Sequence, residues 1–195
     1  MQKYLLALFI PLLSVSASFA QGTVSFKNYF GNASTDPAVY FSGGLTRVSG
    51  SQYLVALMAG PSIGSEAQIA TTTFLTQAGA AGFFQGGTVS IPNVVGGGVA
   101  WISIKVWDTT LSGTTTGATY AQAESYSAVS GLPNLWGSSI DFTVVTGDPN
   151  ANPPTVPAFL VPGLSSFTLV PVPEPSTLAL AALSASMLML FRRRS

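Results

Sequence analysis

Apolar and polar positions alternate with a period of two along much of the chain, which is typical of β-strands with one buried face. The clearest case is the eight-residue segment 100–107, where Ile102, Ile104 and Val106 share one face. Segment 53–59 is apolar on both faces, as expected of a central strand that is covered on both sides. Shorter alternating segments lie at 23–27, 88–91, 140–144 and 167–169. Together they predict a mainly β domain.

Glycine and proline mark the connections between these segments. Gly86 and Gly87 favour a hairpin turn inside 83–89, because glycine accepts the positive φ of a tight turn. The run 96–98 is three glycines and separates the next pair of strands. Segment 147–163 holds five prolines and indicates a loop or an excursion at a sheet edge.

A helix between residues 21 and 170 has only weak support in the sequence. The best candidate is 119–129, where a loop with a short turn fits equally well. We therefore expect an all-β fold, an antiparallel β-sandwich of jelly-roll or immunoglobulin-like type. A β-solenoid is the alternative, but the chain shows no fixed repeat period.

The N-terminus has the pattern of a secretory signal peptide. Lys3 supplies a positive charge, segment 4–15 is apolar, and small residues precede a predicted cut between Ala20 and Gln21. We interpret 1–20 as a signal helix that is removed, 21–170 as the exported domain, and 171–195 as a separate C-terminal segment.

The C-terminal segment has the pattern of a short membrane anchor. Residues 176–191 carry no charge and would form a helix of about 24 Å. A hydrocarbon core is about 30 Å thick. The stems of Arg192, Arg193 and Arg194 can extend the span, and arginines at that end favour the cytoplasmic side. We predict a transmembrane helix at 176–191 that holds the exported domain outside the cytoplasm.

A short motif precedes the apolar run. It consists of Val172, Pro173, Glu174, Pro175 and Ser176. Each proline lacks an N–H and disfavours helix in the residue before it, so the motif is extended. An extended backbone just above the membrane is accessible to a processing enzyme.

This motif, the apolar helix and the terminal arginines resemble the PEP-CTERM sorting signal of bacterial exported proteins, a tail also called the ice-binding protein C-terminal domain. The resemblance implies recognition by exosortase, a membrane transpeptidase, and removal of the tail near the motif. It also implies a bacterium that makes exopolysaccharide. Blocks of the body, among them YLVALMAGP and ISIKVWD, resemble uncharacterised exported PEP-CTERM proteins of Verrucomicrobia-type bacteria. That second resemblance implies a shared β-fold and no known activity.

Composition excludes several classes of function. The chain has no histidine and no cysteine, which excludes disulfides, a Ser-His-Asp triad, a Cys-His pair and a typical zinc site. Segment 21–170 carries three cations and six acids, a thinly spread net charge near −3. Nucleic-acid binding needs clustered Lys and Arg, so we expect no nucleic-acid partner. No cofactor is indicated.

Acid–base chemistry would have to come from carboxylates. Asp108, Glu124 and Asp141 are the candidates for a glycosidase-like pair, although Asp108 and Asp141 have the placement of solvated surface acids. Asp148 opens an Asp-Pro-Asn-Ala-Asn run that partly follows a calcium loop, but Pro153 stands where the loop needs glycine. A turn is the interpretation we prefer. We therefore predict no catalytic residue and no metal ligand.

The polar face of 100–107 is a candidate ligand platform. Trp101, Lys105 and Trp107 share this face, and aromatic rings beside a cation can stack on sugars. The alternative is that the indoles are packed under another part of the fold. Threonine triplets at 71–73 and 114–116 suggest ice binding as an alternative function. Ice binding would need a regular array of threonines across several strands.

These patterns predict an exported, non-catalytic envelope or extracellular-matrix protein. Its partners would be signal peptidase, the inner membrane as a transient anchor, an exosortase-like transpeptidase and exopolysaccharide. We expect the body in the periplasm while the tail is anchored, and at the cell surface or outside the cell after processing. The alternatives are a carbohydrate- or ice-binding surface module and a carboxylate-based envelope hydrolase.

Overall fold

The structure is a computed structural model, and it describes residues 21–31, 36–111, 117–130, 132–133, 135–161 and 163–170. These residues form one α-helix, α1 (Tyr120–Ser130), and ten β-strands. The strands are β1 (Gln21–Lys27), β2 (Val39–Tyr40), β3 (Tyr53–Gly60), β4 (Ala67–Thr73), β5 (Gln85–Val95), β6 (Val99–Asp108), β7 (Trp136–Ser138), β8 (Phe142–Val145), β9 (Ala158–Phe159) and β10 (Phe167–Thr168).

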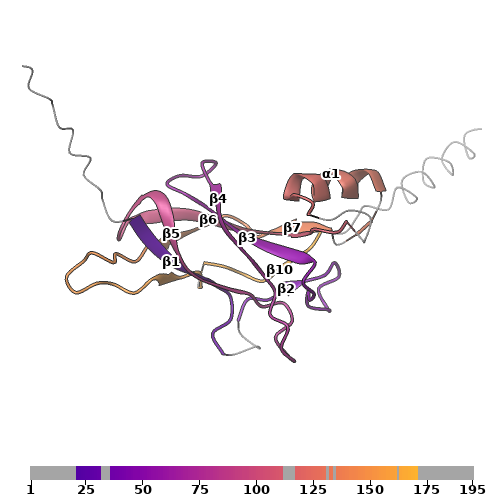
Figure 1. The fold of residues 1–195 in the computed structure, drawn as a ribbon, viewed down its shortest axis with the longest axis horizontal. Helices are drawn as coiled ribbons and strands as arrows, with labels where there is room; N and C mark the ends of the chain where they lie inside the picture. The colour runs from indigo at the N-terminus through magenta and orange to yellow at the C-terminus, as the bar shows by residue number, and fades with distance from the viewer. Residues whose placement is uncertain are drawn as a thin grey trace, which may run out of the picture.

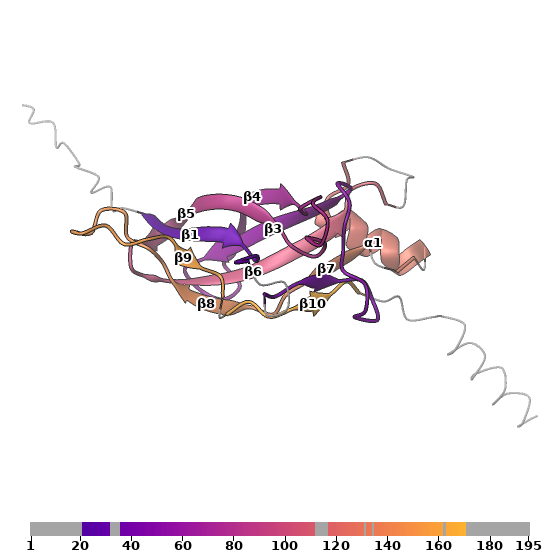
Figure 2. The same ribbon diagram turned by 90° about the horizontal axis from the view of Figure 1, so that it is seen from below.

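The strands form three sheets. The largest has the order β4-β3-β6-β7, and β8 also pairs with β6. The second has the order β5-β1-β9, and the third consists of β10 and β2. The long pairings are antiparallel, as predicted, whereas β1–β9 and β10–β2 are short parallel pairings. Figures 1 and 2 show an elongated body in which β1 begins toward one end of the long axis and α1 lies at the other.

One apolar core joins the sheets. Its buried side chains come from β1, β5, β3, β6 and β2, so the sheets face one another across a shared interior. The core face of β6 is the predicted one, because Ile102, Ile104 and Val106 are all fully buried. This arrangement of mainly antiparallel sheets with one short helix agrees with the predicted all-β sandwich.

The central position of β3 is confirmed. This strand pairs with β4 on one side and with β6 on the other. Val55 and Leu57 enter the main core, while Ala56 lies in a second apolar cluster on the opposite face. The continuous apolar run follows from this double burial.

The predicted hairpin at 83–89 is wrong. Gly86 and Gly87 lie inside β5, opposite β1, at a register shift next to Phe26. A Cβ on Gly86 would collide with the Phe26 ring, and Gly87 has φ 82°. The two glycines therefore form an irregularity in the strand that makes room for a fully buried phenylalanine.

The predicted strand at 140–144 is shorter than expected. Ile140 is 71% exposed and lies outside β8, although Phe142 is buried. The pairing with β6 is interrupted between β7 and β8, where Ser139 exchanges hydrogen bonds with Ile104. The Ser139 hydroxyl thus accepts the Ile104 N–H in place of a backbone carbonyl. Ile140 therefore does not share the buried face of Phe142.

The segment around 119–129 is a helix, so the alternative of a loop with a short turn is wrong. Its start is held by reciprocal bonds: the Gln122 N–H donates to Thr119 Oγ1 at 3.3 Å, and the Thr119 N–H donates to Gln122 Oε1 at 2.8 Å. This is a capping box. Figure 1 shows α1 lying over β7, on the side of the large sheet away from β1.

The proline-rich segment 147–163 is an excursion at a sheet edge, as predicted, with β9 pairing to β1 within it. The predicted signal helix at 1–20 and the predicted transmembrane helix at 176–191 lie outside the described residues. In the part of the chain that is described, no helix is long and apolar enough to cross a membrane.

Candidate functional site

Both predicted processing points border residues held in the fold. Ala20, the motif Val172–Ser176 and the arginines 192–194 lie outside the described residues. Gln21 is the first residue of β1 and pairs with Val95. At the other end the Val170 N–H donates to the Trp136 carbonyl at 2.8 Å. The tail thus follows a residue that is hydrogen-bonded to β7.

The structure places Trp107 in a small apolar cluster under α1. Its side chain is 5% exposed, and its indole Nε1–H donates to the Ala118 carbonyl at 2.7 Å. The ring meets Tyr120 edge-on, with centroids 6.0 Å apart. In this arrangement the faces of the Trp107 indole are covered by the fold instead of by solvent.

Lys105 and Trp136 complete this cluster. Tyr120 also meets Trp136 edge-on at 5.7 Å, and the Lys105 Nζ lies 4.6 Å from the Tyr120 ring centroid. The lysine is therefore engaged in a cation–π contact with the first residue of α1. Its contact helps to hold the helix on the sheet.

Trp101 is half-buried and lies far along β6 from this cluster, beside the pairing with β8. The structure therefore brings Lys105 and Trp107 together under α1 and does not bring Trp101 to them. The Trp101 and Trp107 indoles therefore do not form an exposed, coplanar pair.

The three candidate carboxylates have different environments. Asp108 is 5% exposed, and its Oδ1 accepts hydrogen bonds from the Thr110 N–H and hydroxyl, both at 2.7 Å. Glu124 is exposed on α1, and Asp141 is exposed between β7 and β8. The expected solvated placement of Asp108 is therefore wrong, because its carboxylate is buried and orders the turn after β6. Glu124 and Asp141 face solvent.

The Asp148 run forms the predicted turn. The Asp148 carboxylate accepts the Asn150 N–H at 2.9 Å, and its carbonyl accepts the Thr155 N–H at 2.9 Å. This is an Asx-type turn. Among the described residues, no three acidic side chains gather as metal ligands.

Two tyrosines have shifted protonation equilibria. Burial raises the pKa of Tyr53 to about 12, and the nearby Asp108 carboxylate adds to the shift. Burial likewise raises the pKa of Tyr120 to about 12, with a smaller contribution from Glu124. In both cases the neutral phenol is favoured because a phenolate would lose its hydration.

Sequence reasoning missed Asn28, a fully buried polar residue that follows β1. Its Nδ2 donates to the carbonyls of Pro37 at 2.7 Å and Gly82 at 3.0 Å, and its Oδ1 accepts the Phe84 N–H at 2.7 Å. The side chain thus ties three segments together beside a surface hollow. The only sequence signal is an amide at the end of an alternating strand, followed by two aromatic residues.

Comparison with known proteins assigns the tail alone. Residues 171–194 match the family described as the PEP-CTERM protein-sorting motif. No curated protein and no solved structure matches the chain, so the resemblance of the body to Verrucomicrobia-type proteins stays a prediction. The chain carries a PEP-CTERM sorting motif, which indicates a protein that exosortase sorts to the exterior through a membrane-associated stage.

Proposed function

We propose that this chain is an exported, non-catalytic protein of the cell envelope or extracellular matrix, delivered by its C-terminal tail. Signal peptidase would cut after Ala20, and the tail would hold the body in the periplasm. An exosortase-like transpeptidase would then remove the tail near Pro173–Pro175. The body would reach the cell surface or the medium and associate with exopolysaccharide. The jelly-roll or immunoglobulin-like form of the sandwich stays a prediction.

The observation that carries this proposal is the match of residues 171–194 to the sorting motif. The geometry of the body is compatible with it, because β10 pairs with β2 and the Val170 N–H donates to the Trp136 carbonyl of β7. Cutting the tail beyond Val170 would therefore leave the described hydrogen bonds intact. The absence of histidine and cysteine, with candidate acids that serve a turn or face solvent, supports a non-catalytic role.

A carbohydrate-binding module is the second candidate, and a surface hollow beside Tyr29 favours it over ice binding. Thr71 and Thr73 are exposed on β4, but the neighbouring strand β3 places Ala56 and Leu54 opposite them. These two strands thus carry no threonine array of the kind that ice binding would need.

The test of sorting replaces Pro173, Glu174 and Pro175 with alanine in the full chain, expressed in a bacterium that processes the native protein. We expect the variant to insert in the inner membrane and to keep its tail, because the extended segment that the enzyme would grip is lost. Cell fractionation with intact-mass determination measures both properties.

The matched control replaces Pro149 and Pro154, two exposed prolines in the body, with alanine. This control should be trimmed like the native chain. Equal trimming and release of the motif variant would contradict the sorting proposal.

A further inference from the structure

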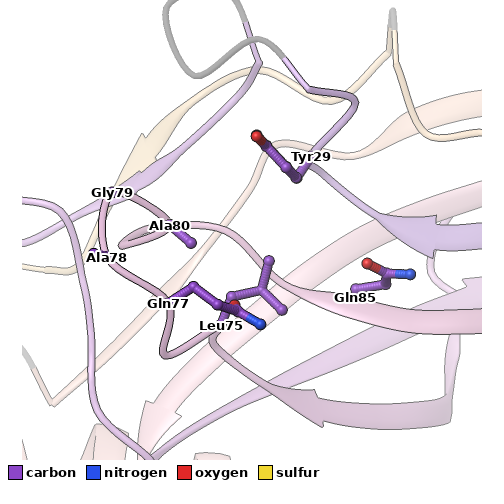
Figure 3. A pocket seen from close by; sticks show the side chains of 7 residues that line it. All are labelled: Tyr29, Leu75, Gln77, Ala78, Gly79, Ala80 and Gln85. Atoms are coloured by element: carbon purple, nitrogen blue, oxygen red, sulfur yellow. The ribbon is translucent and has the colours of Figure 1, made fainter.

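A surface hollow lies where β1 ends and the loop between β4 and β5 returns. It has a volume of about 460 Å³, within the usual range for small-molecule sites of about 300–1,000 Å³. Tyr29 lines it from the segment after β1, and Gln77 lines it from the loop. Figure 3 shows Tyr29 across an open space from Leu75 and Gln77, with Gln85 farther along the chain at the start of β5.

The walls of the hollow are held in place by hydrogen bonds. Asn28 joins the end of β1 to the residue before β5 and to Gly82, as described above. Within the loop the Leu75 N–H donates to the Phe83 carbonyl at 2.8 Å, and the Ala80 N–H donates to the Gln77 carbonyl at 3.0 Å. The hollow is thus largely formed before any ligand arrives, which lowers the cost of binding.

The Tyr29 ring is positioned by a second aromatic ring. Its centroid lies 5.1 Å from that of the buried Phe83, at an interplanar angle of 40°. Arg47 lies 4.9 Å from the Phe83 centroid, so its guanidinium packs on that ring, and it is not among the residues that line the hollow. Tyr29 is half-buried, which leaves part of its surface to the hollow.

The polar groups of the lining are neutral. Gln77 and Gln85 are exposed, and neither side-chain amide has a hydrogen-bond partner among the described residues. Each amide can both donate and accept, as a sugar hydroxyl can. The nearby Lys27 ammonium is engaged elsewhere, 4.9 Å from the Phe30 centroid and 5.3 Å from that of Phe159.

This chemistry separates the possible classes of ligand. A phosphate or an acidic sugar needs cationic partners, and a metal ion needs several oxygen ligands with negative charge; the lining supplies neither. A wholly apolar ligand would leave the two amides without partners. A neutral sugar fits, because its C–H face can stack on the Tyr29 ring while its hydroxyls bond to the amides.

We propose that this hollow binds one or a few residues of an uncharged polysaccharide, with Tyr29 as the stacking ring and Gln77 and Gln85 as the hydroxyl partners. This site rests on the proposed function, since it would supply the polysaccharide contact of the exported body. None of the residues that line it belongs to the Trp107 cluster under α1.

Affinity electrophoresis of the full chain tests the site. The chain is kept in a polyoxyethylene detergent, which has no sugar headgroup, and is run in gels that contain dextran, laminarin or galactomannan as neutral probes, or alginate as an acidic one. We expect retardation by at least one neutral probe and not by alginate. Tyr29→Ala should weaken that binding about 10-fold, because it removes the stacking ring.

Gln77→Ala and Gln85→Ala should each weaken binding about 5-fold, the worth of one hydrogen bond of about 1 kcal/mol. Both residues are exposed, so these variants should keep the native melting temperature. Tyr29→Phe should bind nearly as the native chain does, because it keeps the ring. Trp101→Ala, a half-buried aromatic on β6, is the matched control and should bind normally.

Three results would overturn the site: no retardation by any neutral probe, retardation by alginate alone, or native-like retardation of the Tyr29→Ala and glutamine variants. Loss of binding by Trp101→Ala with normal binding by the Tyr29 variant would move the sugar contact to β6. Tail trimming of the same variants reports sorting separately. If binding fails while the tail is trimmed normally, only the proposed sugar site is refuted. If the tail of the native chain is not trimmed, the proposed function is refuted.

Discussion

At the scale of single residues, the fold depends on polar side chains that no hydrophobic pattern reveals. Asn28 is fully buried and satisfies backbone groups of three residues, Pro37, Gly82 and Phe84. The alternation of Val24 and Phe26 predicts β1 and its core face correctly. It does not indicate that the next amide would be buried, because asparagine is more often found in exposed turns. The bonds of Asn28 form between segments distant in sequence, and single-sequence patterns carry no such information.

Asn28→Ala should lower the free energy of unfolding by about 2–4 kcal/mol. The substitution leaves the carbonyls of Pro37 and Gly82 and the Phe84 N–H without their partner in the interior. Urea denaturation measures the change. Asn150→Ala, at an exposed turn position, should cost less than about 0.5 kcal/mol. Equal effects of the two substitutions would show that the buried amide is dispensable.

The raised pKa values of Tyr53 and Tyr120 predict alkaline unfolding. Each phenol has a pKa of about 12 in the folded protein, above the ordinary tyrosine pKa of 10.0. The folded state therefore binds the proton more tightly, so the stabilisation is complete below pH 10 and is lost as pH rises through 12. Melting temperatures measured from pH 9 to 12 should fall for the native chain. They should fall less for Tyr53→Phe/Tyr120→Phe, and identical slopes would contradict this assignment.

At the scale of elements, local pattern succeeds where one face of a strand meets the core and fails where tertiary contacts decide. The face of Ile102, Ile104 and Val106 is predicted correctly because burial follows the pleat. β4 has no clear apolar alternation, so the pattern does not predict it. Its place is set by pairing with β3. The glycines of β5 look like a turn, but a ring of β1 occupies the space that they leave.

The helix is a different case, because its signal was present in the sequence. Thr119 and Gln122 have the spacing of a capping box, and the structure shows both of its hydrogen bonds. The apolar residues of α1 do not form one buried face: Val129 is 90% exposed, whereas Ala123 and the polar Ser127 are buried. Hydrophobic periodicity alone therefore gives too weak a prediction of the helix. The helix is stabilised by the contacts of Tyr120 with Trp107 and Trp136.

Trp107→Ala should destabilise the protein by about 3 kcal/mol, because it empties the centre of the cluster under α1 and frees the Ala118 carbonyl. Trp101→Ala should cost clearly less, since Trp101 is only half-buried. Chemical denaturation of both variants tests the ranking. A native-like stability of Trp107→Ala would show that the indole is free for a ligand, as the platform hypothesis requires.

At the scale of the whole molecule, the residues that carry the sorting motif lie in the C-terminal tail, and the described body precedes them. The sorting motif was predictable from sequence, because its information is local: two prolines, an apolar run and terminal arginines. The hollow beside Tyr29 was not, because its lining comes from segments on both sides of β4. The tail begins directly after residues bonded to β7 and β2, so its removal should leave the body folded.

Intact-mass determination of the protein recovered from each fraction of the native bacterium tests delivery most directly. We predict that the released or surface-bound form begins at Gln21 and ends near Pro173–Pro175, while a longer form with the tail is found in the inner membrane. Recovery of the full-length chain, with both terminal segments intact, from the soluble cytosolic fraction would contradict the account.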